Sequence, residues 1–293
     1  MNRKVSTNVR TTETELNFPA RDGYVLAGTL RRPADGEAKA FVLIGSATAV
    51  PRQFYGKFAA YLAENGFAVL TFDYRGVGGS RPKSLRGFPA SMRDWAALDL
   101  SAAIDFAAHE AKGRPLVLVG HSFGGQALGL VPNSPKISRA LLVAAQVGYW
   151  RLFPPPENYR VYARLRLIGP ALAHAFGYLP GWLGVGQDLP KGVFLEWAGW
   201  CMKPRYLFDD ATLETRKNFP KYKGAMRAIG LADDKWAPPK AVALLLEGYT
   251  GTKPEHLTVA PRDVGASKIG HFGFFRADRC DTLWKQAAEW LAR

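Results

Sequence analysis

The sequence PLVLVGHSFGG, at residues 115–125, is the stretch that decides the fold of this chain. An apolar run at residues 115–119 leads directly into GHSFG at residues 120–124, which fits the pattern G-x-S-x-G, and a helix-forming stretch follows. A buried strand that turns sharply into a helix around a serine is the setting of a nucleophile elbow. The turn strains the serine backbone, so neighbouring positions must be small, and it lifts the hydroxyl to a helix N-terminus. We therefore predict that Ser122 is a nucleophile, with a helix-capping serine as the alternative.

The rest of the chain supplies the sheet that such a turn requires. Short apolar runs bounded by glycine predict strands that are buried on both faces, and stretches with helical spacing separate them. The alternating pattern of residues 13–32 predicts two antiparallel strands joined by a turn. The sequence therefore predicts an α/β fold, with a mostly parallel sheet, helices on both faces and antiparallel strands at its N-terminal side. The predicted parallel strands lie at residues 40–44, 67–72, 115–119, 141–145, 225–229 and 257–259.

The strand–helix alternation stops between residues 147 and 221. This stretch is rich in Trp, Pro and Tyr and shows helical pieces without buried strands. We predict a core domain formed by residues 1–146 and 222–293, interrupted by an aromatic-rich helical cap insertion at residues 147–221. Its aromatic side chains could bury the interface of the cap itself, or they could line an apolar substrate pocket. The candidate pocket residues are Trp150, Trp197 and Trp200.

A serine nucleophile needs a histidine to accept its proton, and the histidine needs an acceptor for its other N–H. Among the five histidines, His271 lies after the last predicted strand and before the final helix, at the same sheet edge as Ser122. We predict that it is the base, with a buried structural histidine as the alternative. Asp234, in the loop after the strand at residues 225–229, is the predicted acid, and Asp233 is its alternative.

The order Ser122, Asp234, His271 and the sequence DYRGVGGS at residues 73–80 resemble the α/β-hydrolase superfamily. The chain is most similar to the bacterial branch of monoacylglycerol-lipase-like and serine-aminopeptidase-like sequences. The resemblance implies that residues 73–80 support the architecture near the site.

The resemblance also implies an oxyanion hole made of two backbone N–H groups. One would come from Phe123, the residue after the nucleophile. The other would come from the segment after the first strand of the parallel sheet. Here that segment lacks the His-Gly common in the family, and we assign the donor to Ala47, with Ser46 or Thr48 as alternatives.

These residues predict hydrolysis of an ester, thioester or amide through an acyl-enzyme, on a hydrophobic acyl substrate. No metal or organic cofactor is expected, because no metal-ligand spacing is present. An acyltransferase or a cofactor-free perhydrolase would use the same three residues. A non-catalytic binding protein on the same fold is a further alternative.

Composition limits the other classes of function. The formal net charge is +14, but the basic residues are scattered and form no long run, so we expect no nucleic-acid partner. Two cysteines, Cys201 and Cys280, predict no disulfide framework. Residues 1–8 lack the apolar region of a secretory signal, and no apolar run is long enough for a membrane span. We expect a cytoplasmic protein with a small acyl ester as its partner.

Overall fold

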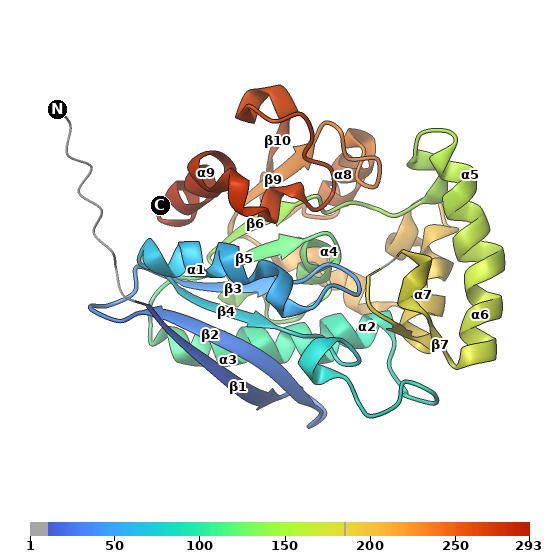
Figure 1. Ribbon diagram of the computed structural model, residues 1–293, viewed down its shortest axis with the longest axis horizontal. Coiled ribbons are helices and arrows are strands. Elements are labelled where there is room, and N and C mark those ends of the chain that lie inside the picture. The colour runs from blue at the N-terminus through green and yellow to red at the C-terminus, as the bar shows by residue number, and fades with distance from the viewer. Residues whose placement is uncertain (1–10, 185) are drawn as a thin grey trace.

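The computed structural model describes residues 11–184 and 186–293, so the N-terminal segment tested for a secretory signal lies outside the described residues. An eight-stranded sheet runs through the molecule in the order β1-β2-β4-β3-β5-β6-β9-β10 (Figure 1). The first two pairings, β1 with β2 and β2 with β4, are antiparallel, and the others are parallel. The strands are β1 (Thr11–Pro19), β2 (Val25–Pro33), β3 (Phe41–Gly45), β4 (Ala68–Phe72), β5 (Leu116–His121), β6 (Arg139–Val143), β9 (Ala225–Leu231) and β10 (Glu255–Val259).

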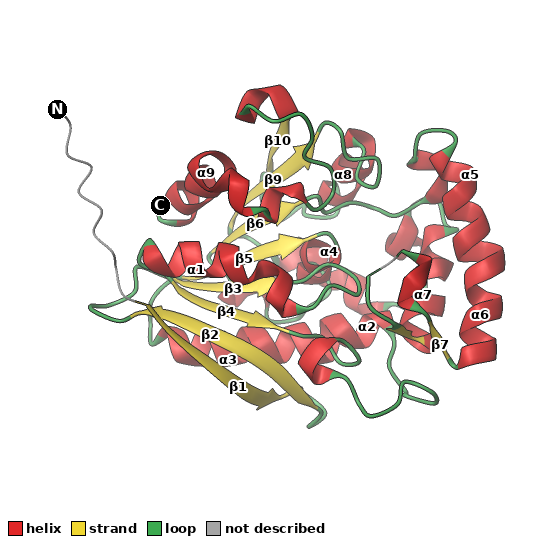
Figure 2. Cartoon of the chain, in the orientation of Figure 1, coloured by secondary structure: helices red, strands yellow, loops and turns green. Residues whose placement is uncertain are grey.

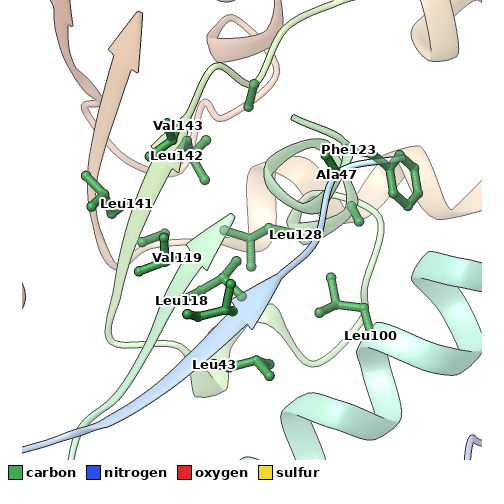
Figure 3. Close-up of a cluster of buried hydrophobic side chains, with 14 of the residues drawn as sticks. Leu43, Ala47, Leu100, Leu118, Val119, Phe123, Leu128, Leu141, Leu142 and Val143 are labelled. Carbon is green, nitrogen blue, oxygen red and sulfur yellow. The ribbon is translucent and has the colours of Figure 1, made fainter. Parts of the chain in front are cut away.

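Helices cover both faces of this sheet, as the apolar runs predict (Figure 2). Every residue of β3, β4 and β5 is buried, because each of these strands faces a helical layer on both sides. Leucine and valine side chains from β3, β5 and β6 pack together with Leu128 of α4 (Figure 3). The covering helices are α1 (Gly56–Glu64), α3 (Ser101–Ala111), α4 (Phe123–Leu128), α8 (Pro239–Leu246) and α9 (Lys285–Leu291).

The helical stretch at residues 92–111 is not one regular α-helix. It consists of α2 (Met92–Asp94), a π-helical turn (Trp95–Leu100) and α3. Within the turn, Asp99 is completely buried, and its carboxylate accepts hydrogen bonds from the backbone and guanidinium N–H groups of Arg75. Arg75 belongs to the loop at residues 73–80, so the irregular turn fastens this loop beside the sheet edge.

Residues 147–221 lie at the end of the molecule toward which the parallel strands point (Figure 1). Besides helices, they contain a two-stranded antiparallel sheet, β7 (Tyr178–Leu179) with β8 (Leu189–Pro190), which the sequence does not predict. The strands are only two residues long, too short to produce a recognisable pattern. That residues 147–221 form a separate cap domain stays a prediction. The main helices are α5 (Glu157–Tyr162), a π-helical segment (Ala163–Ile168), α6 (Gly169–Phe176) and α7 (Lys191–Cys201).

Within residues 11–184 and 186–293, none of the helices is both long and apolar enough to cross a membrane. Both cysteines are free thiols, Cys201 buried and Cys280 partly buried.

Candidate active site

Ser122 occupies a strained turn between β5 and α4. Its backbone angles are φ 50° and ψ −114°, and its N–H donates to the carbonyl of Val143 on the neighbouring strand at 2.9 Å. Glycine is required beside it, since a Cβ on Gly124 would lie 2.1 Å from the carbonyl oxygen of Gly45. The first turn of α4 therefore lies directly against the end of β3. A serine hydroxyl here stands at a helix N-terminus, where the free N–H groups favour negative charge.

His271 and Asp234 form a buried pair at the same sheet edge. The two atoms His271 Nδ1 and Asp234 Oδ2 are 2.7 Å apart, and the other carboxylate oxygen of Asp234 accepts the backbone N–H of Trp236 at 2.8 Å. The Asp234 side chain is completely buried and that of His271 is 9% exposed. Because an ionised carboxylate only accepts, Nδ1 carries the proton of the neutral imidazole. Its Nε2 then has a free lone pair with which to accept a proton.

Asp233, the alternative acid, has a different contact set. Its two carboxylate oxygens accept the backbone N–H groups of Ile269 at 2.8 Å and Gly270 at 2.9 Å. These residues immediately precede His271, so Asp233 holds the loop and Asp234 holds the imidazole. The two carboxylates are adjacent in the chain but bind different groups.

His121, next to Ser122, belongs to a chain of hydrogen bonds that links two loops. The backbone N–H of Ala47 donates to Tyr55 Oη at 2.8 Å, and Tyr55 Oη lies 2.8 Å from His121 Nδ1. His121 Nε2 lies 2.9 Å from the carbonyl oxygen of His271. A carbonyl only accepts, so Nε2 carries the proton, and Nδ1 accepts from the tyrosine hydroxyl. Burial holds the pKa of His121 well below its usual range, which keeps the imidazole neutral.

This chain of bonds bears on the predicted oxyanion donors. The N–H of Ala47, the first predicted donor, donates to Tyr55 Oη, although Ala47 also lines the cavity. Thr48, one of the two alternatives, follows in the same loop and lines the cavity beside Ser122. The choice between Ala47, Ser46 and Thr48 stays a prediction, but Tyr55, from the segment before α1, already accepts the N–H of Ala47. The N–H of Phe123 is at the first position of α4, where no intrahelical acceptor exists.

A cavity of about 110 Å³ opens at Ser122 and His271. Its apolar wall comes mainly from residues 147–221, which contribute Phe153, Val161, Leu165, Trp197 and Cys201.

Of the three tryptophans predicted for a pocket, only Trp197 is part of this lining. Trp200 is buried elsewhere and donates its indole N–H to Asp210 at 2.8 Å, while Trp150 packs against Tyr162. Those two aromatic side chains pack within residues 147–221, which is the alternative role predicted for the aromatic residues of this stretch.

Three further lining residues were not singled out as candidates from the sequence: Trp236, Gln126 and Gln146. Trp236 stands two residues after Asp234, so its proximity to the acid is a signal that could have been used. Gln126 lies one helical turn after Ser122, and Gln146 follows the end of β6 at the sheet edge. Their positions in the chain put them near the nucleophile, but nothing in the sequence says that their side chains face a cavity.

A family model described as serine aminopeptidase, S33, matches residues 36–183, which is 148 of the 293 residues and thus half of the chain. The chain belongs to this S33 family. The match covers β3, the loop at residues 73–80 and the Ser122 elbow, whereas Asp234 and His271 lie beyond it. No curated protein sequence matches this S33 family member.

Solved structures agree on the fold. Monoglyceride lipase from Saccharomyces cerevisiae has a TM-score of 0.65 at 17% identity, over 99% of this chain and 97% of that one. The esterase from Exiguobacterium antarcticum has a TM-score of 0.61 at 16% identity, over 96% and 100%. The esterase domain of a Rhodothermus marinus protein has a TM-score of 0.60 at 17% identity, over 96% and 98%. The α/β-hydrolase fold predicted from the sequence is confirmed, and family and fold together make the protein an α/β serine hydrolase.

Proposed function

We propose that this protein is a serine esterase that cleaves esters of short acyl groups through an acyl-enzyme intermediate. The observation that carries the proposal is the convergence of Ser122 and the His271–Asp234 pair at the mouth of one mostly apolar cavity. Carboxylate, imidazole and hydroxyl in this order are the arrangement that makes a neutral serine nucleophilic. The esterases and the lipase of similar fold are consistent with this choice of substrate.

In the proposed mechanism, His271 Nε2 accepts the proton of the Ser122 hydroxyl as Oγ attacks the ester carbonyl carbon. The N–H groups of Phe123 and Thr48 hold the oxyanion, and a donor of this kind contributes about 2.7–4 kcal/mol to transition-state stabilisation. His271 then gives its proton to the leaving alcohol. In the second half, His271 deprotonates a water molecule, which attacks the acyl-enzyme and releases the acid. Asp234 keeps the imidazole oriented throughout.

An ester fits the cavity better than the N-terminus of a peptide does. A peptide substrate of an aminopeptidase carries an α-ammonium group, and burying this charge requires a carboxylate partner. Neither Asp nor Glu occurs among the described residues that line the cavity. The small volume also favours a short acyl group, since a cavity of about 150 Å³ is filled by one benzene molecule.

The proposal is tested by hydrolysis of p-nitrophenyl esters of increasing acyl length. We expect activity on short acyl chains that falls as the chain grows, and loss of turnover in Ser122→Ala and in His271→Ala, with both variants folded. Release of the free acid, rather than transfer to an added alcohol, distinguishes hydrolysis from acyl transfer. Turnover that survives both substitutions would place the chemistry elsewhere.

A further inference from the structure

Two buried amide side chains in the cavity have no protein partner for their oxygen atoms. Gln126 is 3% exposed and Gln146 is 5% exposed, and both line the cavity. Within the described part of the chain, neither Oε1 atom accepts a hydrogen bond. Buried polar groups in proteins nearly always have a partner, and leaving one without a partner costs stability. A pair of such groups in one cavity indicates that a ligand completes their hydrogen bonds.

The two glutamines are fixed to the backbone that carries the nucleophile. The backbone N–H of Gln126 donates to the carbonyl of Ser122 at 3.2 Å, so its side chain starts one helical turn beyond the serine. Gln146 directly follows Ala145, whose Cβ would be 2.5 Å from a Cβ placed on Gly125. The segment after β6 therefore touches the first turn of α4. Both glutamines line the cavity, together with apolar side chains from residues 147–221.

The hydrogen-bonding groups and the charge of the cavity lining limit which chemical groups the two amides can bind. An amide offers an acceptor at its oxygen and donors at its nitrogen, and a hydroxyl group, which both donates and accepts, matches either end. An ammonium group is disfavoured because the described lining contains no carboxylate. A purely hydrocarbon acyl chain would leave both amides without partners. The partner that fits is therefore a neutral hydroxyl group on a short chain.

We propose that Gln126 and Gln146 form a polar subsite for a hydroxyl group on the acyl chain, so that the preferred substrates are esters of short hydroxy acids. This inference rests on the proposed esterase function, because it places the acyl group in the cavity beside Ser122.

The test compares esters that differ only by a hydroxyl in place of a methyl group. One pair is p-nitrophenyl 3-hydroxybutanoate and 3-methylbutanoate, and a second pair is the 2-hydroxypropanoate and 2-methylpropanoate esters. For each pair, the ratio of kcat/KM values is divided by the ratio of the rates of alkaline hydrolysis, which removes the intrinsic difference in reactivity. We expect the corrected ratio to exceed about ten for at least one pair, since a site that hydrogen-bonds a substrate hydroxyl discriminates against analogues that lack it.

Gln126→Met and Gln146→Met keep the length of the side chain but remove its amide. We expect each substitution to lower the corrected ratio about tenfold for the preferred pair, mainly through the hydroxylated substrate. Leu165→Met is the matched control in the same lining, and it should change both members of a pair equally. Gln286→Met, an exposed glutamine on α9, should change neither.

The melting temperature Tm of the variants is a second measurement. If the two amides served only the fold, their removal would lower Tm. Without ligand, Gln126→Met and Gln146→Met should raise or preserve Tm, because each removes a buried amide whose oxygen has no partner. A fall in Tm together with an unchanged substrate ratio would mean that the amides serve the fold, and the inference would be overturned.

Failure of the inference is distinguishable from failure of the proposed function. If the wild-type protein hydrolyses the alkyl esters with a corrected ratio near one, unaffected by the glutamine substitutions, the amides bind only water and the subsite is rejected. If the protein hydrolyses no ester of either kind, the esterase proposal fails first, and the hydroxyl subsite for its acyl group is rejected with it.

Discussion

Two sets of buried polar side chains surround Ser122, and they differ in how completely their hydrogen bonds are made. Tyr55, His121 and the His271–Asp234 pair form bonds between 2.7 and 2.9 Å that join the loop after β3 to the loop after β10. Gln126 and Gln146, which line the cavity beside the serine, have amide oxygens without a partner in the described chain. In the first set, the bonds that orient the imidazole of His271 are made within the protein, and in the second set the amide oxygens have no partner among the described residues.

The two sets are similarly buried, but this difference in hydrogen bonding indicates different roles for them. A network in which every member has a partner is rigid, and catalysis gains from donors that need no reorganisation during the reaction. Buried amide oxygens without partners lower the stability of the ligand-free protein. Such a loss of stability is typical of sites where activity is traded against stability. We expect substitutions in the first set to lower the rate for all substrates, and substitutions in the second set to change which substrates are preferred.

The largest expected effect separates the two neighbouring carboxylates. Asp234→Asn should lower kcat about 10³–10⁴-fold, because an amide in place of the carboxylate stabilises the wrong tautomer of His271. Asp233→Asn is the matched control. It removes one of the two acceptors for the loop N–H groups and should lower kcat by about tenfold or less. Steady-state kinetics on one ester, with Tm as a check on folding, measures both. The opposite order of effects would exchange the roles of the two residues.

A smaller loss of kcat is expected when the hydrogen bonds of Tyr55 to Ala47 and His121 are removed. Tyr55→Phe leaves both the Ala47 N–H and His121 Nδ1 without their partner, so the loop that carries Thr48 loses its anchor. We expect kcat to fall about 10–100-fold with little change in KM. This is the pattern expected when an interaction that stabilises only the transition state is weakened.

Tyr24→Phe is the control, because the Tyr24 hydroxyl donates to the carbonyl of Ser80 outside this network. An equal loss of kcat in both variants would indicate a general effect of removing a hydrogen-bonded tyrosine hydroxyl. The network would then have no special place in catalysis.

The smallest effect concerns the pH dependence of stability. His121 has a pKa well below 6.5 in the folded protein because it is buried, whereas in the unfolded chain it titrates near its usual value. The unfolded state therefore binds the extra proton as the pH falls below about 6.5, and the stability contributed by neutral His121 is lost on acidification. The slope reaches about 1.4 kcal/mol per pH unit from this group.

The measurement is the free energy of unfolding in urea at pH 7, 6 and 5 for the wild type and His121→Gln. The difference between the two proteins should shrink as the pH falls, because the variant lacks this titrating group. A difference that stays constant or grows toward acid would contradict the assignment of a neutral, buried His121.

Much of the core follows from the sequence, because strands buried on both faces and the glycine-rich turn at Ser122 leave strong local patterns. The catalytic acid could be narrowed only to Asp233 or Asp234, since both stand in one loop and their side-chain directions depend on how that loop folds. The oxyanion donor stays a prediction, and the sequence could not show that the Ala47 N–H donates to Tyr55, eight residues later in the chain. Contacts of this kind are set by tertiary packing and leave no pattern in the residue order.

Residues 147–221 illustrate the same limit over a longer segment. Its aromatic content predicts both a pocket and a buried interface, and the structure divides the two roles among individual tryptophans. Composition cannot make that division, because Trp197 and Trp200 stand three residues apart on α7. The two glutamines were not predicted for a related reason. A glutamine on a helix or after a strand is ordinary in sequence, and only the structure shows that its oxygen lacks a partner among the described residues.

The central claim is that Ser122 is the activated nucleophile, and covalent labelling tests it most directly. Folded protein treated with a fluorophosphonate should gain one adduct per chain, located by peptide mass spectrometry on Ser122. The adduct should be absent from Ser122→Ala and should form far more slowly in His271→Ala. No adduct on the folded wild-type protein, or an adduct on a different residue, would contradict the account.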